Sequence, residues 1–207
     1  MDVFILILEL IGAAAFAVSG AMTGIRKNMD IFGACVLGLT VAVGGGITRD
    51  IILGAFPPAM FHDPIYAITA ILTCFIVFIP RIHDFLEGNS ILMLLADSIG
   101  LGIFTVSGAA RAFDVTAEAN VFLAVFVGVI TGVGGGLLRD MMAGDPPYIF
   151  VKHIYATAAI AGALLFCFLR TIAPQHIAML SGAILIVVIR LLASHYRWSL
   201  PKPGHRS

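Results

Sequence analysis

The motif "GGGITRD" occupies residues 44 to 50, and a close copy, "GGGLLRD", occupies residues 134 to 140. Each copy lies inside a long apolar stretch. Three glycines weaken a helix there, and a charged pair is expensive to bury there. The repetition of such an unfavourable combination indicates that these residues have a function. This repeat therefore decides both the predicted fold and the place to look for a functional site.

The composition predicts an all-α integral membrane protein. The chain has 207 residues, of which 60% are hydrophobic and only 12% are charged, too apolar for the surface of a soluble domain. The formal net charge is zero and no long basic run occurs, so no nucleic-acid partner is indicated. The cysteines and histidines lack ligand spacing, so we predict no metal site and no cofactor.

Seven apolar segments qualify, or nearly qualify, as membrane spans, because a helix needs about 20 apolar residues to cross the hydrocarbon. Charged or turn-forming clusters such as "RKNMD" separate them. The first segment lacks the basic region and cleavage site of a secretory signal, so we interpret it as a retained span. The predicted transmembrane helices cover residues 3–25, 31–56, 64–80, 91–111, 119–143, 153–170 and 176–193.

The chain also aligns with itself beyond the glycine motif. "FAVSGA" at 16–21 matches "FTVSGA" at 104–109, and "PPAMFHDPIYA" at 57–67 resembles "PPYIFVKHIYA" at 146–156. An odd number of spans in each copy makes the second copy enter the membrane from the opposite face. We therefore predict two inverted three-helix repeats plus one extra helix, with the first repeat at 1–88, the second at 89–172, and the seventh helix and basic tail at 173–207.

The distribution of basic residues predicts the orientation, because cytoplasmic loops carry an excess of Lys and Arg. One side of the predicted topology carries only Arg111 and Arg170. The N-terminus is therefore expected outside and the C-terminus in the cytoplasm. The cytoplasmic side would carry Arg26, Lys27, Arg81, Lys152, Arg190, Arg197, Lys202 and Arg206.

Aromatic residues near the predicted span ends are interpreted as interfacial anchors. Tyr66 and Tyr155 begin the third and sixth spans, and Tyr196 and Trp198 follow the seventh. Tyrosine and tryptophan are enriched at both membrane–water interfaces. The tail "HYRWSLPKPGHRS" at 195–207 is accordingly predicted to anchor at the membrane surface and then run into a flexible end.

The two glycine triplets are predicted to break or bend their helices. Breaks at equal depth would surround one polar cavity, and the freed carbonyls would be suitable ligands for a cation. The alternative is close helix packing, since small residues also recur at every fourth position around each triplet. The charged residues next to the triplets favour the polar cavity over simple helix packing. The kink residues would be Gly44, Gly45, Gly46, Gly134, Gly135 and Gly136.

The charged residues near the triplets are predicted to form two clusters, one on each side of the glycine constriction. Charges at this depth usually face a partner or a watery cavity. Neighbours at i and i+1 on a helix point in different directions, so each arginine should find its main partner on another span. A purely structural ion pair is the alternative. The expected clusters are Glu9 with Arg49 and Asp50, and Asp97 with Arg139 and Asp140.

Two further repeated features have simpler readings. Ser19 and Ser107, inside the repeated "VSGA", could line the pathway or bond within and between helices. The proline pairs at 57–58 and 146–147 are expected to stop the second and fifth helices.

Seven spans in a 3+3+1 plan, with GGG-x-x-RD followed by a double proline in each half, resemble the trimeric intracellular cation (TRIC) channel family, specifically its prokaryotic members. The resemblance covers nearly all of residues 3–193. It implies a homotrimer among membrane lipids in the inner (plasma) membrane of a prokaryote. Each subunit would hold its own pore for monovalent cations, chiefly potassium, lined by helices kinked at the triplets. No counterpart of the lysine motif of animal members is present in the second or fifth span, so their lipid regulation is not carried over.

Several functions remain open on the sequence alone. The first is a passive cation channel for potassium or sodium ions. The second is a secondary transporter of a small zwitterion such as glycine, because inverted repeats with broken helices are also a transporter design, and some bacterial relatives have been linked to glycine. The third is an anion or proton pathway led by the two arginines. An enzyme is not expected, because the chain contains no nucleophile–base pair, HExxH or nucleotide-binding loop.

Overall fold

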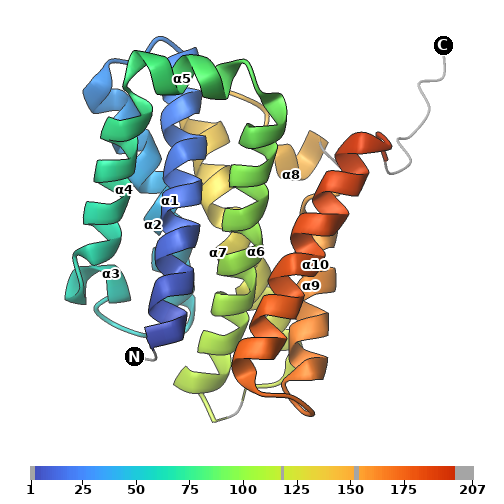
Figure 1. Ribbon diagram of the computed structural model, residues 1–207. Helices are drawn as coiled ribbons and strands as arrows, with labels where there is room; N and C mark the ends of the chain where they lie inside the picture. The colour runs from blue at the N-terminus through green and yellow to red at the C-terminus, as the bar shows by residue number, and fades with distance from the viewer. Residues whose placement is uncertain (1–2, 118, 152–153, 199–207) are drawn as a thin grey trace, which may run out of the picture.

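The computed structural model describes residues 3–117, 119–151 and 154–198, which form a bundle of helices joined by short connections (Figure 1). No strand occurs within these ranges. The helices are α1 (Val3–Arg26), α2 (Ile31–Ile52), α3 (Ala59–His62), α4 (Ile65–Val77), α5 (Pro80–Glu87), α6 (Ser90–Val115), α7 (Val121–Met142), α8 (Tyr148–Val151), α9 (Ala156–Leu169) and α10 (Gln175–His195).

Five helices, α1, α2, α6, α7 and α10, are long and apolar enough to cross a membrane alone. The helix α4 has 13 residues and α9 has 14, so each extends roughly 20 Å against a hydrocarbon core of about 30 Å. A bend of 85° separates α4 from α5, which lies across one end of the bundle (Figure 1). In its described residues the structure is thus an all-helical membrane protein with five apolar spans, or six if the bent pair is one span.

Four helices form the centre of the bundle. The helix α1 packs against α2 and α6, and α7 packs against α2 and α6. The helix α4 covers α1 and α2, while α9 and α10 cover α6 and α7, and the start of α1 and the end of α10 lie at opposite ends of the bundle (Figure 1). Small residues at the contacts allow this close approach: the fully buried stretch of α6 from Gly100 to Ala110 contains three glycines and two alanines.

The second predicted span ends four residues earlier than expected and the fifth within one residue of the prediction, but the prolines stop neither helix. The helices α2 and α7 end at Ile52 and Met142, several residues before their proline pairs. Gly54 has a φ of 67° and Gly144 a φ of 72°. This left-handed conformation just after a helix is the usual glycine stop, because glycine has no Cβ to clash.

The predicted break at the glycine triplets is wrong for this conformation. Both helices continue as α-helix through the triplets, and the two triplets lie against each other where α2 crosses α7. A Cβ on Gly45 would overlap the carbonyl oxygen of Thr131, and a Cβ on Gly135 would overlap that of Val41. The missing side chains are therefore used for close packing, the alternative that the small-residue spacing indicated.

Candidate functional site

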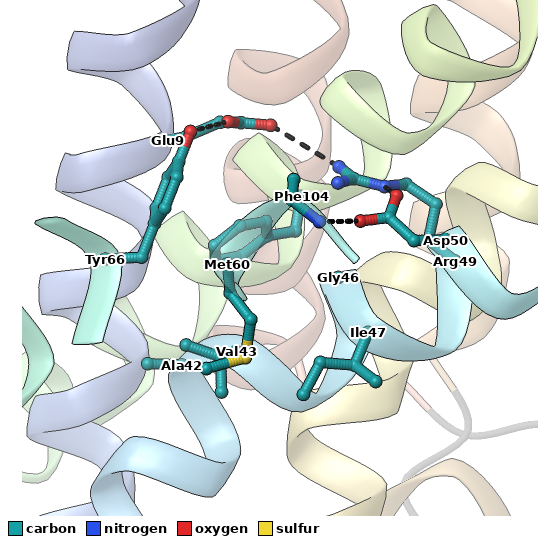
Figure 2. Close-up of a pocket in the computed structure, with 11 residues that line it drawn as sticks. Glu9, Ala42, Val43, Gly46, Ile47, Arg49, Asp50, Met60, Tyr66 and Phe104 are labelled. Atoms are coloured by element: carbon teal, nitrogen blue, oxygen red, sulfur yellow. Dashed lines mark hydrogen bonds and ion pairs between the residues drawn. The ribbon is translucent and has the colours of Figure 1, made fainter. Parts of the chain in front are cut away.

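A first cluster of charged and polar side chains is buried among α1, α2, α4 and α6 (Figure 2). The Arg49 Nη1 atom lies 3.5 Å from Oε1 of Glu9, and Arg49 Nε donates to Oδ1 of Asp50 at 2.8 Å. The Tyr66 hydroxyl donates to Oε2 of Glu9 at 2.6 Å, and the Ser107 hydroxyl also bonds Glu9. All three charged residues are buried: Glu9 is 7% exposed, Arg49 6% and Asp50 1%. Every carboxylate oxygen of this cluster therefore has a partner.

A second cluster of the same design lies among α1, α6, α7 and α10. The Arg139 Nη1 atom contacts Oδ1 of Asp97 at 2.6 Å and the hydroxyl of Ser19 at 2.5 Å, and Nε donates to Oδ1 of Asp140 at 2.8 Å. Arg190 of α10 contacts Oδ2 of Asp97 at 3.0 Å. The structure thus brings together the residues expected in each cluster and adds Arg190 to one of them.

The expectation that each arginine finds its main partner on another span holds for Arg139, which lies 2.6 Å from Asp97 and 2.8 Å from Asp140. It is wrong for Arg49, which lies 2.8 Å from Asp50 and 3.5 Å from Glu9. The long arginine side chain folds back along its own helix, so that Nε reaches the adjacent carboxylate. That carboxylate is held by the first residue of the next short helix: Asp50 Oδ2 accepts the Ala59 amide of α3, and Asp140 Oδ2 accepts the Tyr148 amide of α8, both at 2.8 Å. The Arg-Asp dipeptide therefore joins the end of its own helix, the following short helix and the cluster.

Each of the two serines bonds a charged residue in the other half of the chain. Ser19 in the N-terminal half bonds Arg139 in the C-terminal half, and Ser107 in the C-terminal half bonds Glu9 in the N-terminal half. Each hydroxyl therefore links the two halves of the chain at the level of a charge cluster. A movement of one half against the other would alter both contacts.

Two cavities adjoin the first cluster. One, of about 30 Å³, lies beside Glu9, Arg49 and Gly46 (Figure 2). Because one water needs about 10–15 Å³, this cavity has room for a few waters at most. The other, of about 370 Å³, is lined by His62, Asp63 and Arg111 among others, and Ala59 and Tyr66 line both cavities.

Between the two clusters the bundle is closed. The Phe16 and Phe104 rings stack with centroids 5.4 Å apart, and Gly134 approaches Gly45 so closely that a Cβ built on it would lie 3.1 Å from the Gly45 Cα. The arrangement is therefore two buried polar sites separated by a tight apolar and glycine contact.

The chain is similar to a family of bacterial membrane proteins. A family model described as "Glycine transporter" matches residues 6–81 and 94–171. The UPF0126 membrane protein of Deinococcus radiodurans is 38% identical over 196 residues, 94% of this chain and 89% of the relative. The inner membrane protein YadS of Escherichia coli K12 is 37% identical over 202 residues, 95% of this chain and 93% of the relative.

Solved structures decide the family. A structure of a TRIC cation channel matches with a TM-score of 0.86 at 36% identity, covering 97% of this chain and 98% of the other. The TRIC orthologue of Rhodobacter sphaeroides matches with a TM-score of 0.84 at 32% identity, covering 94% and 98%. This chain belongs to the prokaryotic TRIC family. It is accordingly a multi-pass protein of the bacterial inner membrane.

Three residues of this TRIC chain were misplaced by the sequence reading. Tyr66 and Tyr155 are not interfacial anchors: both are buried, since they occupy matching places against the two clusters. Arg190 was counted with the cytoplasmic charges but is 5% exposed inside α10. The repeated "IYA" and an arginine within the apolar run "LIVVIRLL" are the signals that could have found them.

Some predicted features lie outside the described residues. These are the basic residues Lys152, Lys202 and Arg206, and most of the C-terminal tail. Within the described part of the chain, no group of three or more His, Cys, Asp or Glu side chains could hold a metal ion.

The two buried tyrosines provide a matched test of the first cluster. Tyr66→Phe removes the hydroxyl that Glu9 Oε2 accepts, and losing a partner of a buried charged group costs about 1.5–3 kcal/mol. Tyr155→Phe is expected to be nearly neutral, because its hydroxyl has no hydrogen-bond partner among the described residues. Thermal unfolding of the purified variants in detergent measures both. Equal stabilities would contradict the assigned bond.

Proposed function

We propose that this chain conducts monovalent cations, chiefly potassium, through a pathway in each subunit between α1, α2, α6 and α7. The observation that carries the proposal is the duplicated buried charge cluster. Ionised side chains inside membrane helices are costly and mark functional sites, ion pathways among them. The names of the matched solved structures, which are TRIC cation channels, support the same conclusion.

The chemistry of the first cluster favours a cation. It contains two carboxylates and a single guanidinium among the described residues, and it adjoins a cavity with room for a few waters. Serine and tyrosine hydroxyls offer further oxygen atoms. Hard monovalent cations prefer oxygen ligands.

Opening would require the contact between the triplets to loosen. We propose that α2 and α7 bend at Gly44–Gly46 and Gly134–Gly136 when the pathway opens, because glycine makes those turns the weakest of each helix. Ser19 and Ser107 would then lie along the opened path. The close contact between the triplets would then correspond to the closed state of the channel.

We also propose the architecture around this pathway: two inverted repeats at 1–88 and 89–172, and a segment at 173–207 that adds α10. The family model matches the chain in two stretches, 6–81 and 94–171, which lie within the proposed repeats and support the division. In this plan α4 and α9 are the third and sixth of seven spans, and the N-terminus lies outside. A homotrimer follows from the family, and native mass spectrometry that found only monomer would contradict it.

A second candidate is a carrier of a small zwitterion such as glycine. The description of the matching family model favours it. An arginine and an acid beside the same cavity could hold a carboxylate and an ammonium group. In a carrier the two sites would be exposed alternately, whereas a channel would open both at once.

Planar bilayer recording of the purified protein under a potassium chloride gradient tests the proposal. We expect discrete unitary currents that reverse near the potassium equilibrium potential. Glu9→Gln is expected to lower the unitary current, since it removes the excess negative charge of the first cluster, and the exposed Glu87→Gln serves as the matched control. Absence of currents, together with saturable glycine counterflow in liposomes, would favour the carrier instead.

A further inference from the structure

The helix α10 lies outside the duplicated part of the chain, and it changes only one of the two clusters. Arg190 is buried, and its Nη2 atom lies 3.0 Å from Oδ2 of Asp97. The first cluster has no equivalent contact among the described residues. The seventh helix therefore makes two otherwise matched sites chemically unequal.

Arg190 makes the contact with Asp97 that a tyrosine hydroxyl makes with Glu9 in the first cluster. There, the Tyr66 hydroxyl donates to Oε2 of Glu9 at 2.6 Å. In the second cluster the Arg190 guanidinium takes Oδ2 of Asp97 and lies 4.6 Å above the ring of Tyr155. The Tyr155 hydroxyl is consequently left without a hydrogen-bond partner in the described part of the protein. A neutral donor has been replaced by a cation.

The replacement changes the charge balance. Among the described residues, the first cluster holds two carboxylates and one guanidinium, which leaves one excess negative charge. In the same part of the chain, the second cluster holds two carboxylates and two guanidinium groups, which balance. A net charge beside an ion pathway changes the local concentration of permeant ions, and this effect falls as ionic strength rises.

We propose that Arg190 makes cation conduction asymmetric between the two ends of the pathway. The inference rests on the proposed channel function and deepens it. Cations entering from the Glu9 end are concentrated by the excess negative charge, and cations entering from the Asp97 end meet a neutral site. At equal and opposite voltages, the current of cations that enter at the Glu9 end is therefore the larger one.

Unitary currents in symmetric potassium chloride test this inference. The wild-type protein is expected to rectify, more strongly at low than at high ionic strength. Arg190→Gln gives the second cluster its own excess negative charge, so the ratio of currents at opposite voltages falls toward one. Arg190→Lys keeps the charge and the rectification. Asp97 keeps its contact with Arg139 in both variants.

Two further variants separate charge from structure. Asp97→Asn leaves the second cluster with an excess positive charge, so rectification increases, and this readout holds even if Arg190→Gln does not fold. Arg81→Gln, which removes an exposed arginine of α5, leaves the ratio unchanged. Wild-type currents that change linearly with voltage, or rectification unaffected by Arg190→Gln and Asp97→Asn, would overturn this inference and leave the proposed channel function standing. Absence of any wild-type cation current would overturn the proposed function with it.

Discussion

Replacing Arg49 by methionine is expected to destabilise the folded protein by about 3–5 kcal/mol, the usual effect of leaving a buried charge uncompensated. Arg49 is the only guanidinium in the first cluster among the described residues. Its loss leaves the buried carboxylates of Glu9 and Asp50 without a cation. Methionine keeps most of the side-chain length, so the effect reports charge more than volume.

The second cluster supplies the comparison. Arg139→Met is expected to destabilise less, because Arg190 still contacts Asp97 at 3.0 Å. Arg81→Met removes an exposed charge and is expected to change stability by less than about 0.5 kcal/mol. Denaturant unfolding in detergent measures the order. Adding Glu9→Gln to Arg49→Met should recover part of the loss, since it removes one unpaired carboxylate. If Arg49→Met behaved like Arg81→Met, the first cluster would not hold its charges as the distances indicate.

The long helices could be predicted from the sequence because span length is a local property. The apolar runs that predicted spans at 3–25 and 176–193 became α1 and α10 within two residues at each end. The segment predicted at 64–80 behaved differently. Its helix ends at Val77, and Pro80 begins a second helix at 85° to it. That bend depends on how α5 packs across the end of the bundle, which no local pattern contains.

The charge pairs were predictable for a different reason. The internal repeat assigns Glu9 and Asp97 to matching positions, and the structure brings them within 3.5 Å and 2.6 Å of Arg49 and Arg139. Their role in conduction stays a prediction. The contact of Arg190 with the second cluster was not predictable from the repeat, because α10 has no copy. The burial of Arg190 depends on how α10 packs against α6.

The breaks at the triplets were predicted from glycine's weakness as a helix former, and this argument left out the neighbouring helix. Glycine lowers helix stability by roughly 1 kcal/mol relative to alanine, but a helix held on both sides by close backbone contact does not need that propensity. Both helices therefore continue unbroken through the triplets, and a bend there stays a prediction.

Gly45→Ala is expected to destabilise the protein strongly, whereas Gly46→Ala, one residue away, is expected to be neutral or slightly stabilising. Both changes gain about 1 kcal/mol of helix propensity. A Cβ on Gly45 would overlap the Thr131 carbonyl oxygen and lie 3.1 Å from its carbon, so the two helix backbones must separate. Overpacking of this kind costs about 1–3 kcal/mol or more. A Cβ on Gly46 meets only an Arg49 nitrogen at 4.0 Å.

The difference between these two variants isolates the contact between α2 and α7, because the gain in helix propensity is common to both and cancels. Thermal unfolding in detergent should place Gly45→Ala several degrees below Gly46→Ala. Gly135→Ala should resemble Gly45→Ala, since its Cβ would overlap the Val41 carbonyl oxygen from the other side of the same crossing. Bilayer recording adds a functional readout: separated helices are expected to raise the open fraction of Gly45→Ala channels. If Gly45→Ala were as stable as Gly46→Ala, the triplets would not be in backbone contact, and the closed crossing could not be the constriction between the two clusters.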